Sequence, residues 1–362
     1  MDSTENNLSF TFVLFREYQI FGAISHDILR RAIGVSMFRG TTIVLVECTE
    51  EFVKHAQEYC NDFNIKFIIS SFDELIDYNF YNNIIITHTW SQTMYSVSKI
   101  FGIKNLILIE EVVPLSDRFK KPCIDQTLKN RILTLGPILK VITIKYRRYI
   151  RKSMKYIAIS DDQKNLLIKR YSLIPSFVSY DPIDKRFFKY KEQSTRNSLL
   201  VFNNLQYDHQ FMNIIDRCRK IGVSKIICIG GEKPSTILNG MTIEHIESYT
   251  FTEITEIYSS AMLAITNEAK GSFELIPMES LASGVPIITP EVPSIKILEH
   301  YLSNNENQPF FNYFEFLNAD LEAIHSWYSS ADKSRSDFSK KVLNMFSPET
   351  VAKEFLLNLK LN

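Results

Sequence analysis

The stretch that decides the fold is KGSFELIPMESLASGVPIITP, from Lys270 to Pro290. It opens with a Gly-Ser pair, passes through small residues and ends in a β-branched run, Val285 to Thr289. This order predicts a loop, a short helix and then a strand. A helix start leaves backbone N–H groups unpaired, and these attract a phosphate or a sugar oxygen. Glu279 is expected about one and a half turns into the helix, where it can face a ligand or simply solvent.

Length and composition limit what this protein can be. A chain of 362 residues with 45% hydrophobic content is long enough for two packed domains. The 41 basic residues equal the 41 acidic ones, so no overall charge favours nucleic acid. The five cysteines are odd in number and lack C-x-x-C spacing, which predicts neither a disulfide framework nor a zinc site. Together with a polar N-terminus unlike a signal peptide, they lead us to expect a cytoplasmic protein.

The first part of the chain alternates between apolar runs and helical patterns. Strands are expected at 8–15, 41–46, 65–70, 83–87 and 105–109, with helices at 21–38, 50–63 and 91–101. This rhythm predicts a parallel, doubly wound sheet with right-handed crossovers. Ligands of such sheets bind outside the carboxyl ends of the strands.

Two candidate residues follow expected strands in this region. His88 comes directly after Ile84-Ile85-Ile86-Thr87, and Glu110 follows Leu106-Ile107-Leu108-Ile109. A histidine there can contact a ligand or act as a hydrogen-bonded loop residue. A glutamate there can orient a sugar hydroxyl, serve an acceptor as a base, or remain a solvated loop acid.

The charge balance changes between residues 118 and 155. Twelve lysines and arginines face a single acid, Asp125, and they alternate with apolar residues. Such a segment can lie on an anionic membrane surface, hold an anionic acceptor, or form an ordinary solvated helix face. No aromatic-plus-basic module accompanies it, so we do not expect a nucleic-acid partner.

The opening stretch also resembles the signature of glycosyltransferase family 4, retaining nucleotide-sugar transferases of the GT-B fold. The matching positions are Phe273, Leu275, Glu279, Ala282, Gly284, Val285 and Pro286. A second match lies about a hundred residues earlier, where YIAISDDQKNLLIKRY and the turn Asp181-Pro182-Ile183-Asp184 resemble the family's passage between domains. No Asp-x-Asp triplet is present, and the resemblance implies a reaction without metal or other cofactor.

The resemblance implies a domain organisation. Residues 1–183 are expected to form a Rossmann-like acceptor-side domain, and residues 184–345 a Rossmann-like nucleotide-sugar-side domain facing it across a cleft. Residues 346–362, in which Ser347 is a capping serine and Pro348 the first helical position, are expected to form a helix that packs back on the first domain.

The resemblance also implies site residues. Glu279 would hold the ribose hydroxyls, and the loop backbone would face the sugar and diphosphate. The glycine turn at Gly22 would help to admit the donor and acceptor, or it is an ordinary loop glycine. Apart from the resemblance, the turn Gly230-Gly231 after an expected strand can approach a nucleotide base or simply close a strand–helix unit. Glu110 occupies the place of a family histidine that contacts the donor sugar. The implied loop residues are Ser272, Phe273, Glu274, Leu275 and Ile276.

The sequence departs from the family at three polar anchors. Asn204 and His209 replace the arginine and lysine that hold the diphosphate, and Gly271 replaces the first glutamate of the family's pair. Two fixed cations contribute strongly to diphosphate binding, whereas asparagine is neutral and histidine only partly charged near neutral pH. Glu274 is a candidate to take over part of the missing glutamate's role.

The resulting hypothesis is a retaining glycosyltransferase that moves a sugar from a nucleoside-diphosphate sugar to a hydroxyl acceptor on a glycan, lipid or protein. Peripheral membrane contact through residues 118–155 would suit a lipid acceptor. Two alternatives stay open: a GT-B-like binding or partner protein that has lost activity, and a sugar-nucleotide epimerase of the same architecture.

Overall fold

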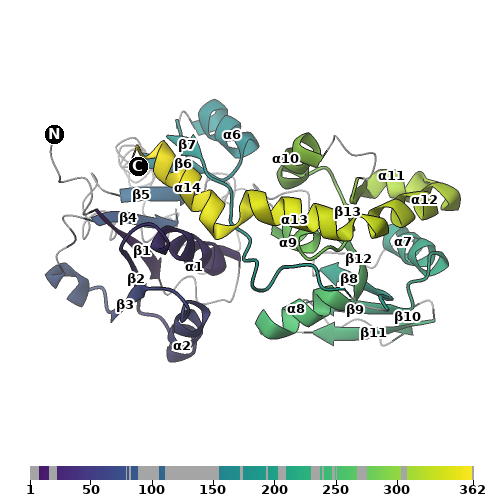
Figure 1. Ribbon diagram of the computed structural model, residues 1–362, viewed down its shortest axis with the longest axis horizontal. Coiled ribbons are helices and arrows are strands. Elements are labelled where there is room, and N and C mark those ends of the chain that lie inside the picture. The colour runs from purple at the N-terminus through teal and green to yellow at the C-terminus, as the bar shows by residue number, and fades with distance from the viewer. Residues whose placement is uncertain are drawn as a thin grey trace, which may run out of the picture. The chain divides into compact units, whose positions relative to one another are not determined.

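The computed structural model places two seven-stranded sheets in succession along the chain (Figure 1). The chain divides into two compact units, Met1–Tyr180 with Ala352–Asn362, and Asp181–Val351. Sequence analysis placed the corresponding boundaries at 183 and 345. The structure describes residues 8–15, 23–78, 80, 83–88, 106–110, 155–171, 174–192, 195–202, 209–229, 237–238, 240–246, 249, 251–266, 275–302 and 308–360.

The first unit is a parallel sheet with the strand order β3-β2-β1-β4-β5-β6-β7. Its inner strands are largely buried apolar runs, as expected of strands covered on both faces, whereas the edge strand β3 is only partly buried. In chain order the elements are β1 (Ser9–Phe15), α1 (Ala23–Ser36), β2 (Thr41–Val46), α2 (Glu50–Tyr59), β3 (Ile65–Ser70), the 3₁₀ helix η3 (Glu74–Asp77), β4 (Asn83–His88), β5 (Leu106–Glu110), β6 (Lys155–Ala158), α6 (Asp161–Tyr171) and β7 (Phe177–Val178).

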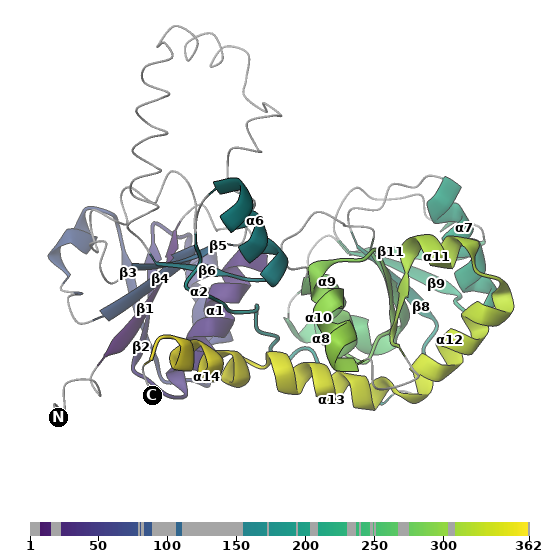
Figure 2. The same cartoon turned by 90° about the horizontal axis from the view of Figure 1, so that it is seen from above.

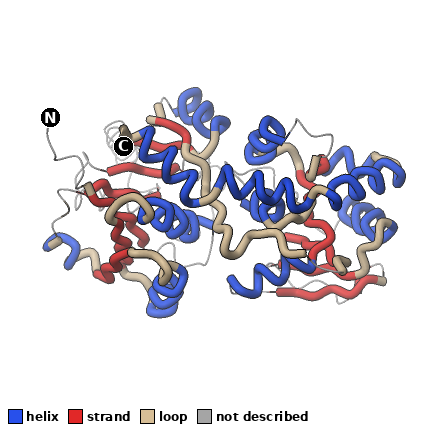
Figure 3. Tube along the Cα trace, in the orientation of Figure 1, coloured by secondary structure: helices blue, strands red, loops and turns tan. Residues whose placement is uncertain are grey.

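The second unit has the strand order β10-β11-β9-β8-β12-β13-β14, and among its described pairings only β10 with β11 is antiparallel. Its elements are β8 (Ser198–Phe202), α7 (His209–Lys220), β9 (Lys225–Ile229), β10 (Ile237–Leu238), β11 (Met241–Ile246), α8 (Phe251–Ser260), β12 (Ala261–Ile265), α9 (Leu275–Ala282), β13 (Ile287–Thr289), α10 (Pro293–Leu302), β14 (Phe310–Asn312), α11 (Tyr313–Asn318), α12 (Leu321–Lys333), α13 (Arg335–Phe346) and α14 (Pro348–Asn358). Strands and helices alternate along much of both units (Figure 3).

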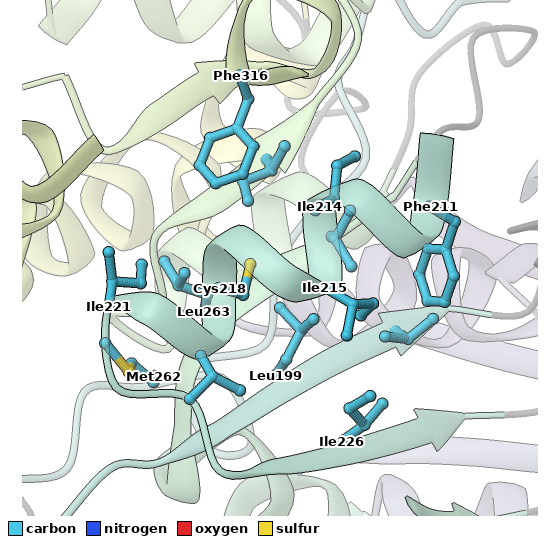
Figure 4. Close-up of a cluster of buried hydrophobic side chains, with 14 of the residues drawn as sticks. Leu199, Phe211, Ile214, Ile215, Cys218, Ile221, Ile226, Met262, Leu263 and Phe316 are labelled. Atoms are coloured by element: carbon cyan, nitrogen blue, oxygen red, sulfur yellow. The ribbon is translucent and has the colours of Figure 1, made fainter. Parts of the chain in front are cut away.

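The core of the second unit forms between its sheet and α7. Figure 4 shows this helix lying over the strands, with Phe211, Ile214, Ile215 and Cys218 among the clustered side chains. These positions follow the i, i+3, i+4, i+7 spacing that puts side chains on one face of a helix. Burying each large apolar side chain stabilises the fold by about 1.5–3 kcal/mol. Helix α7 lies on one side of the sheet, and α9 and α10 lie on the other (Figure 2).

The C-terminal helix α14 returns to the first unit, as predicted. The Ser347 hydroxyl accepts a hydrogen bond from the Thr350 backbone N–H at 3.2 Å, so it caps the helix start ahead of Pro348. The Phe355 ring lies 6.2 Å from the Phe10 ring and 5.8 Å from the Phe177 ring. The expected GT-B architecture, two doubly wound sheets with a C-terminal helix crossing back, is therefore confirmed.

Among the described residues, no helix is long and apolar enough to cross a membrane. The predicted membrane contact at 118–155 lies outside the described residues, apart from Lys155 at the start of β6.

Candidate functional site

Helix α9 carries the only candidate donor acid whose side chain the structure describes, Glu279. The helix begins at Leu275, and Glu279 follows just over one turn later and is partly buried. Leu275 and Ile276 are also partly buried, whereas Met278 is fully buried. Pro277 is tolerated because it stands in the first turn, where an N–H group has no partner within the helix. The predicted short helix followed by a strand is confirmed, and the loop predicted before the helix lies outside the described residues.

The end of α9 is fixed by its own turn. Val285 N–H donates to the Ser280 carbonyl at 2.8 Å, and Gly284 N–H donates to the Leu281 carbonyl at 2.9 Å. This is a Schellman motif, which needs a residue with positive φ, and Gly284 supplies it with a φ of 74°. A Cβ on Gly284 would also lie 2.5 Å from Cδ2 of Tyr190. Both observations explain the glycine in this stretch.

Two side chains of helix α13 form hydrogen bonds to the end of α9 and the turn after it. The buried Arg335 donates to the Gly284 carbonyl at 2.7 Å and to the Met262 carbonyl at 2.8 Å. Ser339 donates to the Ala282 carbonyl. These bonds satisfy carbonyl groups at the end of α9, which otherwise lack partners. They fix the helix relative to β12, so the helix start has a set position in the second unit.

The topology explains why α9 begins where a ligand can bind. Strands β8 and β12 are neighbours, but the chain runs from β8 outward to β9 in one direction and from β12 to β13 in the other. This is the switch point at which doubly wound sheets bind ligands beyond the carboxyl ends of their strands. Asn204 follows the end of β8, and α9 follows β12 after nine further residues. The sequence therefore assigns both to one edge of the sheet.

The first unit has a corresponding switch point between β1 and β4. Its described residues form a buried cluster there. The Arg31 guanidinium donates through Nε to both carboxylate oxygens of Asp27, at 2.9 and 2.7 Å, and Nε2 of His88 lies 3.4 Å from Oδ2 of Asp27. Arg31 also donates to the Ser179 hydroxyl at 2.8 Å and to its carbonyl at 3.1 Å. His88 ends β4, as predicted, but its side chain is only 4% exposed.

Electrostatics in this cluster favour an ionised carboxylate. Burial alone would raise the pKa of Asp27, but the Arg31 guanidinium and the His88 imidazole lower it to about 2. Burial lowers the pKa of His88, and the Asp27 carboxylate opposes this shift only in part. At neutral pH the cluster therefore holds a carboxylate, a guanidinium and a neutral imidazole. Such a group can orient a neighbouring backbone or pass on a proton.

Sequence reasoning missed Asp27, Arg31, Arg335 and Ser339. The i, i+4 spacing of Asp27 and Arg31 on an apolar helix was a usable signal for an ion pair. Ser339 gave no such signal, and the i, i+3 spacing of Asp332 and Arg335 does not reveal the contacts of Arg335 with backbone carbonyls far away in sequence. Among the described residues, no group of three or more histidine, cysteine, aspartate or glutamate side chains could hold a metal ion.

The structure does not describe the side chains of several predicted site residues. Glu110 is the last residue of β5 and pairs with Ala158 of β6, and His209 is the first residue of α7. The side chains of both lie outside the described part of the structure. The remaining positions lie wholly outside the described residues: Gly22, Asn204, Gly230, Gly271, Ser272, Phe273 and Glu274.

Solved structures resemble this fold over nearly its full length. Sucrose-phosphate synthase from Thermosynechococcus elongatus has a TM-score of 0.61 at 11% identity, with 98% of each chain covered. A glycosyltransferase from Rickettsia africae has a TM-score of 0.60 at 12% identity, covering 98% of this chain and 99% of that one. UDP-GlcNAc 2-epimerase from Neisseria meningitidis has a TM-score of 0.56 at 12% identity, covering 98% and 100%. No protein-family model and no curated protein sequence matches.

Proposed function

We propose that this protein is a retaining glycosyltransferase that transfers a sugar from a nucleoside-diphosphate sugar to a hydroxyl acceptor. The observation that carries the proposal is α9, a helix that starts after β12 at the switch point and bears Glu279 in its second turn. The GT-B fold and the signature residues of 270–290 support it. The fold alone hosts several activities, so the assignment depends on this site.

In the proposed complex, Glu279 accepts hydrogen bonds from the ribose hydroxyls of the donor. The start of α9 faces the diphosphate, because unpaired N–H groups and the helix dipole favour negative charge there. Glu274 lies in the preceding loop by sequence and is proposed to contact the sugar. This arrangement needs Glu279 to remain ionised, since a carboxylate is the stronger acceptor.

The proposed reaction exchanges one bond for another at the anomeric carbon. The bond from that carbon to the β-phosphate oxygen breaks, and a bond to the acceptor oxygen forms on the same face of the sugar. The acceptor proton passes to the departing phosphate or to Glu110, and the nucleoside diphosphate leaves. We assign no metal or cofactor to this reaction.

The buried cluster of the first unit has a supporting role in this proposal. His88 is held at the end of β4 by the Asp27 carboxylate, and Arg31 ties the same carboxylate to Ser179. We assign to His88 the positioning of the carboxyl end of β4, on the edge of the sheet where ligands bind. Glu110, which ends the next strand, is the proposed acceptor-side base.

The experiment that tests the function is a donor screen followed by one substitution. Nucleoside-diphosphate sugars are screened by thermal shift, because specific binding raises the apparent stability by mass action. Sugar release or transfer from the best donor is then compared for the unaltered protein and Glu279→Ala. Loss of the ribose contacts should lower kcat/KM by roughly 10- to 100-fold, equivalent to about 1.4–2.7 kcal/mol.

The matched control is Glu322→Ala, which removes an exposed carboxylate from α12 in the same unit. It should leave turnover unchanged. Equal turnover by the Glu279→Ala variant and the unaltered protein would contradict the proposed function.

Two alternatives make different predictions. The replaced anchors Asn204, His209 and Gly271 favour a binding protein that has lost activity, which would bind no donor or would bind it without turnover. The similarity to UDP-GlcNAc 2-epimerase favours an epimerase, which would turn over the donor without any acceptor. Measuring free nucleotide with and without acceptor separates all three.

A further inference from the structure

Two histidines of the first unit, His26 and His55, face each other from neighbouring helices, and we call them the histidine pair. Nε2 of His26 in α1 lies 3.3 Å from Nε2 of His55 in α2. The ring centroids are 5.6 Å apart, which exceeds the distance between the nitrogens by the width of an imidazole ring, so the rings meet end to end. Both side chains are partly buried. The contact therefore links α1 to α2 through two groups that titrate near neutral pH.

The histidine pair packs against a buried tyrosine. The Tyr59 ring stacks on the His26 ring at a centroid distance of 5.8 Å and lies 6.1 Å from the His55 ring. Tyr59 is 3% exposed, and its hydroxyl accepts a hydrogen bond from Nε of the buried Arg30 at 3.4 Å. This packing limits how far the two imidazoles can move apart without displacing one of the helices.

The hydrogen bond of the histidine pair depends on its protonation state. A neutral imidazole carries a single N–H group, so one of the two facing Nε2 atoms donates and the other accepts. The two neutral rings are therefore opposite tautomers, one protonated at Nε2 and the other at Nδ1. A first added proton can go to Nδ1 of the donating ring and leave the bond intact. A second must occupy the accepting Nε2, which places two N–H groups of two positively charged rings 3.3 Å apart.

The charged neighbours decide which ring takes the first added proton. Burial, then the Arg30 charge and then His55 lower the pKa of His26. Burial also lowers the pKa of His55, but the Glu58 and Glu51 carboxylates of α2 oppose that shift. His55 is therefore protonated first and donates, and His26 is the acceptor whose protonation breaks the bond.

We propose that the histidine pair is a pH-sensitive contact between α1 and α2, closed while one proton lies between the two Nε2 atoms and open when each atom carries one. The direction follows from linkage. The unfolded chain takes up these protons near pH 6.5, whereas the folded pair resists them, so the contact weakens as the pH falls below about 6.5.

Helix α1 connects this contact to the buried cluster at the carboxyl end of β4. Asp27 directly follows His26, and its Oδ2 lies 3.4 Å from Nε2 of His88. Consecutive side chains point about 100° apart around a helix, so one turn of α1 can contact α2 with His26 and the end of β4 with Asp27. A displacement of α1 when the contact opens therefore changes the Asp27–His88 contact. This property goes beyond the proposed transferase activity and does not depend on it.

Long-range proton–nitrogen NMR of the histidine rings in the full-length protein tests the proposal, because the two ring nitrogens have different shifts in each tautomer. The single variants His26→Gln and His55→Gln assign the signals. At about pH 7.5, one unit above the ordinary histidine pKa, the two rings should be opposite tautomers. In acid, His55 should be protonated first and His26 second, both below about pH 6.5.

The His55→Gln variant measures the repulsion between the rings. Glutamine can still form a hydrogen bond with His26 but carries no charge in acid. The pKa of His26 should rise by about one unit, because a like charge 3.3 Å away no longer forms. His325→Gln, which removes an exposed histidine from α12 of the second unit, is the matched control and should leave both protonation steps unchanged. Circular dichroism verifies that each variant is folded, and the tautomers of the unaltered protein provide the test if one is not.

The ring signals of His88 show whether the change reaches the buried cluster. They should undergo a transition at the same pH as the second protonation of the histidine pair. The double variant, His26→Gln with His55→Gln, should remove that transition.

Four results would overturn the proposal. Identical tautomers of His26 and His55 at neutral pH would show that no proton is shared. An unchanged pKa of His26 in the His55→Gln variant would show that the rings do not repel each other. Protonation of His26 at or above about pH 6.5 would reverse the expected direction. A His88 ring that does not respond to the second step would contradict the connection through α1.

Discussion

Two buried arginines, Arg31 in the first unit and Arg335 in the second, have their positive charges compensated in different ways. Arg31 is 5% exposed and faces Asp27, a fully buried carboxylate on the same helix. Arg335 is 2% exposed and donates mainly to the Gly284 and Met262 carbonyls, while its acidic partner Asp332 is 48% exposed. One arginine is neutralised inside the protein, and the other keeps its counter-charge at the surface.

This difference decides what the loss of a partner costs. A charge left buried without its counter-ion destabilises a protein strongly, whereas an exposed partner contributes little because water replaces it. Backbone carbonyls cannot be removed by substitution, so the Arg335 network has one vulnerable member, the arginine itself. The Arg31 network has two vulnerable members, the Arg31 and Asp27 side chains.

The largest expected effect is that of Asp27→Ala. It leaves the Arg31 guanidinium buried beside His88 without a carboxylate, so we expect the free energy of unfolding to fall by about 3–5 kcal/mol. Urea unfolding followed by circular dichroism measures the loss. A loss below about 1 kcal/mol, the range of exposed pairs, would contradict the view that Asp27 neutralises a buried charge.

Arg335→Met should come next. It removes donors from two buried carbonyls and leaves only the half-exposed Asp332 carboxylate without its partner, so we expect a loss of about 3 kcal/mol. Arg335→Lys is the matched control, because it keeps the charge and removes the planar fork that reaches both carbonyls. If the lysine variant were as stable as the unaltered protein, charge rather than fork geometry would explain this site.

Acid should destabilise the first unit more than the second. His26 in α1 is partly buried, with Nε2 3.3 Å from Nε2 of His55, and desolvation followed by the Arg30 charge puts the pKa of His26 well below 6.5. A histidine kept neutral in the folded state favours folding above its unfolded pKa, so stability should fall as the pH drops below about 6.5, by up to about 1.4 kcal/mol per pH unit.

Hydrogen exchange at pH 7 and pH 5 measures this prediction unit by unit. Amides of α1 and α2 should lose protection first, and His26→Phe should reduce the pH dependence. The same loss of protection in α7 and α9 would show that the two units do not differ in this respect.

The smallest effect should be that of Asp332→Ala. Its carboxylate lies 2.6 Å from Nε of Arg335 but is about half exposed, so water can replace it. We expect a loss of at most about 1 kcal/mol. A loss comparable to that of Asp27→Ala would remove the distinction between the two arginines.

Much of the fold followed from local patterns. Strands β1 to β5 of the first sheet and β13 of the second appeared as apolar runs, because burial in a parallel sheet leaves a clear signal. No helices or strands were predicted for residues 291–346, although the structure places α10, β14, α11, α12 and α13 there. These elements are short, and β14 has only three residues, too few for a period to show.

The candidate site could be predicted only where its residues lie in one contiguous segment of the sequence. Helix α9 and Glu279 came from contiguous sequence, and so did the position of His88 at a strand end. The burial of His88 was not predictable, because it depends on Asp27 and Arg31, which are about sixty residues away in sequence. Long-range contacts of this kind leave no pattern in the local sequence. The hydrogen bond from Arg335 to the Gly284 carbonyl is another example.

The return of α14 has a consequence for how the protein is made. The strands of the first sheet are synthesised early, but Phe355, which packs against both Phe10 and Phe177, is made only after the whole second unit. Domains generally fold in order of synthesis. Here the first unit must wait for the second to be synthesised before α14 can pack on it, and a stop before Ala352 would deprive it of these contacts.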